Sequence, residues 1–235
     1  MSEPVPSLRM VRAGLALVGF GVCLLWILFA WATIGLLVNR EHPEQFTQDW
    51  PGTVVAVLWP TFLAVQLAGQ LLCLTAPREW HVRGSEVPAL ALNLLHLGLF
   101  VALFPYRWQF WGALFWALLL LGPALHLLFV TNFAPRIDQE PLGERAGLLT
   151  FYLLVLLAFP VLLVVSFLVF GRFRGALEVI VLLFLLGAAL LLMLVSLALY
   201  LNLHLAVYNA IPRYLDTLAE KQKLKEAGWV DQPPW

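Results

Sequence analysis

The chain has 235 residues, of which 62% are hydrophobic and 12% charged, and its 14 basic residues balance its 14 acidic ones. Soluble domains carry about 25% charged residues, so a chain this apolar could not cover its surface in water. The balanced charge provides no basic surface for nucleic acid, and we expect no nucleic-acid partner.

Six long apolar segments follow one another, and every Lys, Arg, Asp and Glu lies outside them. The segments are 13–38, 53–76, 87–104, 108–133, 147–170 and 179–209. About 20 helical residues cross a hydrocarbon core of about 30 Å, so each segment suits one crossing. The shortest, 87–104, has Pro88 in its expected first turn, where proline is tolerated. The sequence predicts an all-α polytopic membrane protein, a six-transmembrane-helix bundle with short loops.

The basic residues outside the spans are divided unequally between the two sides of the membrane. Residues 1–12 form the expected N-terminal tail, 13–209 the transmembrane domain, and 210–235 a short C-terminal helix and tail. Ten of the 14 basic residues fall on the side of these two ends: Arg9, Arg12, Arg78, Arg83, Arg136, Arg145, Arg213, Lys221, Lys223 and Lys225. Because cytoplasmic loops are enriched in Lys and Arg, we expect both termini to be cytoplasmic in a cell or inner membrane.

The N-terminal region also permits another topology. Arg9 and Arg12 precede an apolar run that ends at Ala30-Trp31-Ala32, which resembles a secretory signal with its cleavage site. Cleavage of residues 1–32 is therefore the alternative to a first transmembrane span.

Three of the predicted spans leave the membrane through a Pro-Arg pair. Pro77-Arg78, Pro135-Arg136 and Pro212-Arg213 all lie on the expected cytoplasmic side. Proline ends or bends a helix, and arginine anchors the end among headgroups, which explains the pattern without further assumption. The alternative is an internal duplication of a helical hairpin.

Polar residues inside the spans are the candidate functional residues. Gln66 and Gln70 share a face at i, i+4, where they either join helices or line a polar cavity with Asn93, His96 and His126. Asn93 and His96 share a face at i, i+3, and a hydrogen bond between them would satisfy both.

Two rows of residues, each with a spacing of four, run along the sixth predicted span. Tyr200, His204 and Tyr208 form a stripe that we expect to face headgroups, a cavity or a partner. A second row consists of small residues and suits close helix packing. Its members are Ala198, Asn202, Ala206 and Ala210.

His96, His126 and His204 raise the hypothesis of a b-type haem held by two imidazoles. Centring each charge-free interval on the bilayer places His96 at the midplane. The same construction places His126 about 7 Å and His204 about 13 Å toward the cytoplasm. Two axial ligands need nearly equal depth, so no cofactor is predicted, with haem b as an alternative.

The sequence carries no recognised catalytic motif, and we expect no enzyme. The predicted function is a non-catalytic membrane subunit, scaffold or assembly factor, with a membrane-protein partner or a homo-oligomer in the lipid bilayer. A carrier or flippase for a neutral or lipid-like substrate is the alternative, and haem electron transfer is the third. Ion-driven transport is disfavoured, because it usually needs a carboxylate within the membrane.

Overall fold

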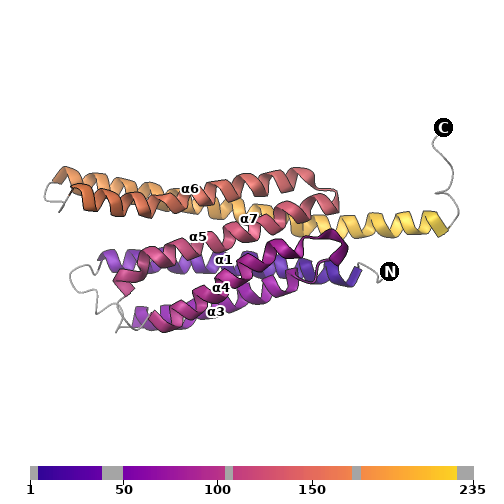
Figure 1. Ribbon diagram of the computed structural model, residues 1–235, viewed down its shortest axis with the longest axis horizontal. Helices are drawn as coiled ribbons and strands as arrows, with labels where there is room; N and C mark the ends of the chain where they lie inside the picture. The colour runs from indigo at the N-terminus through magenta and orange to yellow at the C-terminus, as the bar shows by residue number, and fades with distance from the viewer. Residues whose placement is uncertain (1–4, 39–49, 104–107, 171–175, 227–235) are drawn as a thin grey trace.

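The computed structural model describes residues 5–38, 50–103, 108–170 and 176–226. Within these ranges the chain folds into six α-helices with two short 3-10 turns and no strand. The helices are α1 (Val5–Val38), α3 (Trp50–Cys73), α4 (Arg83–Leu103), α5 (Trp108–Phe133), α6 (Glu140–Phe170) and α7 (Ala176–Glu226). They run along one common long axis (Figure 1), which confirms the predicted all-α bundle.

Five helices among the described residues are long and apolar enough to cross a membrane. These candidate spans are Pro6–Ala32, Gly52–Cys73, Arg83–Leu103, Ala117–Ile137 and Leu191–Glu226. The side chains of α6 beyond Leu157 lie outside the description, and α6 is not among the five. The helical membrane class is therefore supported, and the sixth span stays a prediction.

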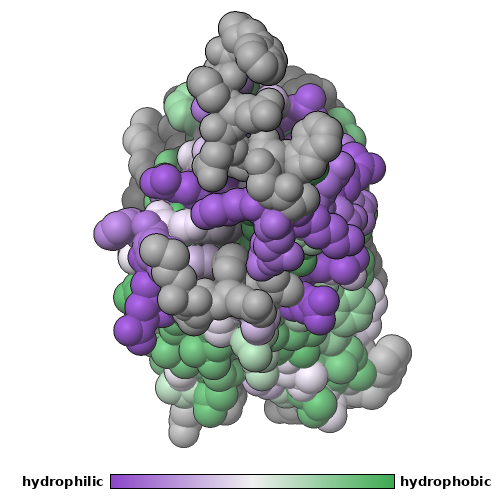
Figure 2. All heavy atoms as spheres, turned by 90° about the vertical axis from the view of Figure 1, so that its right-hand side faces the viewer, coloured by the Kyte–Doolittle hydropathy of each residue, from purple (hydrophilic) through white to green (hydrophobic). Residues whose placement is uncertain are grey.

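One end of the bundle collects the polar residues. Helix α1 begins and α7 ends at this end (Figure 1), and hydrophilic side chains gather across it (Figure 2). The other four basic residues, Arg40, Arg107, Arg172 and Arg174, lie outside the described residues, as does the tail 227–235.

Helices α1 and α3 approach each other closely at glycines. A Cβ atom on Gly14 would meet the Gly69 carbonyl oxygen at 2.6 Å, and one on Gly69 would meet the Gly14 oxygen at 2.7 Å. One helical heptad further along α1, a Cβ on Gly21 would meet the Gln66 Cβ at 3.0 Å. These contacts and the buried face of α1 support its retention in the bundle.

Five of the six helices begin before the predicted spans, and the early starts of α1 and α4 bring charged residues into the bundle. Helix α1 begins at Val5, so most of the expected tail 1–12 is helical, and Arg12 is half-buried. Helix α4 begins at Arg83, one turn before Pro88. Pro88 removes one backbone hydrogen bond but does not set the helix start, and Glu86 enters the first turn, where the helix dipole favours a carboxylate.

The three Pro-Arg pairs do not have the same structural outcome. Helix α3 ends at Cys73, before Pro77, and α5 gives way to a 3-10 turn over Ala134–Ile137. Helix α7 instead continues through Pro212 to Glu226, so the expected separate C-terminal helix is part of α7. Arg83 secures the α3 end by donating hydrogen bonds to the carbonyls of Thr75 and Ala76.

Candidate functional site

Glu86 is the main departure from the sequence prediction. Its side chain is 0% exposed in the first turn of α4, although the sequence placed every carboxylate outside the apolar segments. His126 Nδ1 on α5 lies 2.8 Å from each carboxylate oxygen of Glu86, and the His126 side chain is also fully buried. An acid and a base thus face each other at hydrogen-bond distance with no contact to solvent.

Aromatic rings extend this pair into α7. The His126 and His204 rings stack with centroids 5.3 Å apart and planes inclined by 25°. The Tyr200 ring stacks on the His204 ring in turn, with centroids 4.1 Å apart. We call Glu86, His126, His204 and Tyr200 the acid–histidine cluster, and it joins α4, α5 and α7.

Hydrogen bonding defines the protonation of His204. Its Nδ1 lies 2.9 Å from the Tyr200 carbonyl oxygen, and because a carbonyl only accepts, Nδ1 carries the proton. Nε2 of the neutral ring is then an acceptor. That atom, the His126 Nε2 and the Tyr200 hydroxyl are buried without a hydrogen-bond partner in the described structure. The cluster thus retains unused capacity to bind a proton or a polar group.

Helix α1 covers this part of α7. A Cβ on Gly19 would meet His204 side-chain atoms at 3.6–3.7 Å, which is ordinary contact. Towards the polar end, the Arg12 guanidinium lies 4.0 Å from the centroid of the half-buried Tyr208 ring. Tyr200 and His204 therefore face the interior of the bundle, α1 included, while half-buried Tyr208 lies beside Arg12 toward the polar end.

A second buried group joins α3 to α4. The Asn93 amide nitrogen donates to the Gln70 Oε1 at 3.1 Å, and the Trp59 indole donates to the His96 Nε2 at 3.2 Å. Because the indole N–H only donates, His96 accepts through Nε2. Asn93 and His96 thus each pair across the helix interface, in place of the expected bond between them.

The interior beside these amides is closed. A gap bordered by Gln66, Asn93 and His96 on one side and Pro123 on the other has no room for a water-sized sphere. Gly122 makes this fit possible, since a Cβ there would meet the Asn93 Oδ1 at 2.5 Å. The predicted polar residues Gln66, Gln70, Asn93 and His96 pack against neighbouring helices around this gap and do not line an open cavity.

The row of small residues lies elsewhere than predicted. Asn202 is exposed and Ala206 half-buried, and both border a groove between α6 and α7. Ala198 is exposed as well, while Ala210 is buried. The row is largely an outer face of α7, so the close packing expected of it belongs instead to Gly14 and Gly69.

The arrangement of the three histidines bears on the haem hypothesis. Among the described residues, no group of three or more His, Cys, Asp or Glu side chains is placed to hold an ion. His126 and His204 lie side by side, although the depth construction separated them. Their stacked rings leave no space for a macrocycle between them, which two axial imidazoles would require. The haem hypothesis therefore gains no support from this geometry.

Comparisons with known proteins do not place the chain in a family. No family model, no curated protein and no solved structure matches it.

Proposed function

We propose that this protein is a non-catalytic integral membrane subunit that binds a partner or a second copy of itself through the end of α7. The observation that carries the proposal is the length of this helix. Its 51 residues extend about 77 Å, more than twice the ~30 Å of a hydrocarbon core. The last part of α7 projects beyond the other helices (Figure 1).

The projecting arm, Arg213–Glu226, has the chemistry of a contact surface. Its base is attached to the bundle by Tyr214, whose ring meets the Trp80 ring edge-on at 6.3 Å. From Ala219 to Glu226 every residue is exposed, including Leu224 at 45%. A partner would cover Leu224, which the bundle itself leaves exposed.

The closed interior also supports a subunit. Asn93 and Gln70 pair across α3 and α4, and the gap beside Gln66 has no room for water, as expected of groups that hold helices together. We place the polar end of the bundle in the cytoplasm because its described basic residues, from Arg9 to Lys225, obey the positive-inside pattern.

Native mass spectrometry from mild detergent tests this proposal. The full chain should appear as a stable assembly with a partner or with itself. Leu224→Glu should weaken that assembly, whereas Thr217→Glu, an exposed change on the same arm, is the matched control. A chain that is monomeric at every concentration contradicts the proposal.

A proton-coupled carrier for a neutral or lipid-like substrate is the second candidate, and the Glu86–His126 pair favours it. Carboxylates paired with histidine inside a membrane are typical of proton relays. In proteoliposomes, a carrier of this kind would take up substrate in response to a pH gradient, and Glu86→Gln would abolish that uptake. A pH-driven flux lost in Glu86→Gln would favour the carrier over the subunit.

A further inference from the structure

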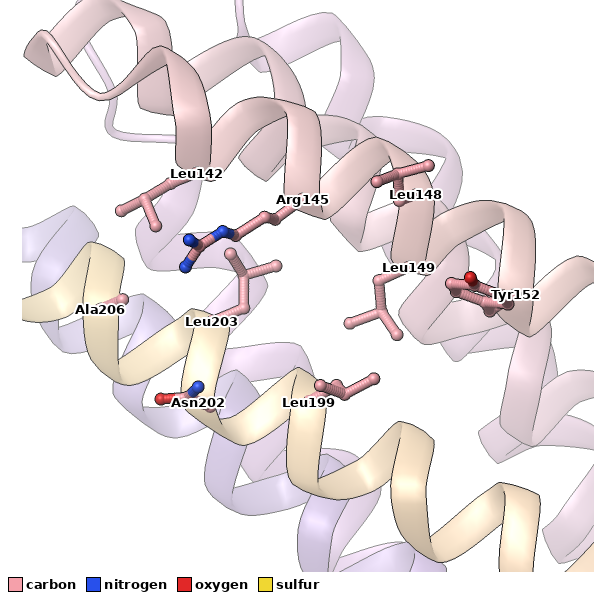
Figure 3. Close-up of a pocket in the computed structure, with 9 residues that line it drawn as sticks. All are labelled: Leu142, Arg145, Leu148, Leu149, Tyr152, Leu199, Asn202, Leu203 and Ala206. Atoms are coloured by element: carbon pink, nitrogen blue, oxygen red, sulfur yellow. The ribbon is translucent and has the colours of Figure 1, made fainter.

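The groove between α6 and α7 has a volume of about 320 Å³ and opens to the outer surface of the bundle (Figure 3). This is within the ~300–1,000 Å³ range of small-molecule sites. Most of its wall is apolar, with Leu149 from α6 and Leu199 and Leu203 from α7 among the lining side chains. A groove that is apolar and open to hydrocarbon suits an alkyl chain.

The polar atoms of the groove are distributed unevenly along it. Arg145 extends from α6 toward α7 and lies over the groove near its polar end (Figure 3). Its side chain is exposed and has no hydrogen bond or ion pair with any described residue. Asn202 lies across from it on α7 (Figure 3) and is also exposed. A guanidinium that can donate to two oxygens is thus available beside a neutral amide.

The α6 wall of the groove runs from Leu142 to Tyr152, which is about 15 Å of helix rise. Arg145 lies just before the predicted span 147–170, where headgroups are expected, and Leu149 and Tyr152 lie within that span. Along the groove the guanidinium comes first and the apolar wall follows, which matches the order of the phosphate and the acyl chain in a phospholipid.

We propose that this groove binds one anionic phospholipid, with its phosphate on Arg145 and an acyl chain along Leu149, Leu199 and Leu203. Arg213 lies two helical turns beyond Ala206 on the same face of α7, outside the lining of the groove. Basic sites between transmembrane helices recognise anionic headgroups in this way. The proposal does not depend on the function proposed above.

Native mass spectrometry with added lipids tests the site. The wild-type chain should retain one phosphatidylglycerol about tenfold more tightly than phosphatidylcholine with the same chains, because both carry the phosphate but only phosphatidylcholine brings a quaternary ammonium close to the Arg145 guanidinium. Arg145→Gln should remove this preference. Arg136→Gln, an exposed arginine at the same end of the bundle but outside the groove, should keep it. Equal losses in both variants would show general surface charge and would overturn the proposal.

Two further measurements test the apolar part. Ala206→Leu narrows the groove and should weaken binding of both lipids about equally. A phosphatidylglycerol with a photoreactive acyl chain should label peptides from 140–157 and 191–213 in the wild-type chain. Labelling confined to other helices, or a polypeptide bound in the groove in place of lipid, would overturn the proposal even if Arg145→Gln folds poorly.

Discussion

Glu86 and His126 are 40 residues apart in the sequence, yet the Glu86 carboxylate and the His126 Nδ1 are 2.8 Å apart in the interior of the bundle. An acid and a base that are both excluded from water depend on each other, because either group alone would be an uncompensated polar group in a low-dielectric medium. This pair makes the first turn of α4 part of the packed interior.

The Glu86–His126 pair should show strong energetic coupling. Removing one partner, in Glu86→Leu or His126→Leu, should lower the free energy of unfolding by about 1–3 kcal/mol, the cost of leaving the other buried polar group without its partner. The double variant should lose much less than the sum of the two, because no polar group of the pair is then left unsatisfied. Equilibrium unfolding in detergent measures this double-mutant cycle, and additive losses would show that the two groups do not interact.

Glycines on α1 and α4 should respond to alanine with opposite signs. Gly14→Ala places a Cβ 2.6 Å from the Gly69 carbonyl oxygen and should cost about 1–3 kcal/mol of stability. Gly98 has open space around it, so Gly98→Ala should stabilise α4 by about 0.5–1 kcal/mol. The unfolding midpoints of the two variants provide the comparison. Equal effects would mean that α1 and α3 are not in close contact.

The Trp59–His96 hydrogen bond should also be measurable. Trp59→Phe keeps an aromatic ring but leaves the His96 Nε2 buried without a donor, at a cost of about 1–3 kcal/mol. Trp80→Phe is the control, because Trp80 is half-buried and contacts Phe133 and Tyr214 through its ring. If the two variants lose the same stability, the cost comes from ring size and not from the hydrogen bond.

Orientation in the membrane can be read from the exposed arm. In a background with Cys23→Ala and Cys73→Ala, Glu220→Cys provides a single exposed thiol. A membrane-impermeant maleimide should label it only after the cells are opened, since the polar end of the bundle is expected in the cytoplasm. Labelling of intact cells would reverse the orientation.

The sequence predicted the helical class because hydropathy alone decides it. Every predicted span overlaps a helix of the bundle. The start of α4 was misplaced because each predicted span was limited to a run without charged residues, and this limit put Glu86 in the preceding connection. A charged residue one turn before an apolar run looks the same whether it is solvated or buried. Only the placement of His126 on a neighbouring helix distinguishes the two cases.

The histidines illustrate a second limit of sequence analysis. The depth of His126 was measured from Arg107 and Arg136, and that of His204 from Glu178 and Arg213. Because α7 continues past Pro212, Arg213 does not mark the end of its helix, and His204 lies side by side with His126. The groove beside Arg145 could not be predicted from the sequence either, because periodicity shows which residues share a helix face but not which helix that face contacts.

The interior of the bundle is packed and closed to water, as expected of a subunit and not of a carrier. Cys73 is a native probe of this packing, because it is fully buried and a Cβ on Gly14 would meet its Sγ at 2.9 Å. The direct measurement is the rate at which N-ethylmaleimide labels Cys73 in a Cys23→Ala chain in membranes. We predict no labelling until the protein is unfolded, under conditions that label Glu220→Cys completely. Labelling of Cys73 as fast as that exposed thiol would contradict the account, since it would show a water-filled path into the bundle.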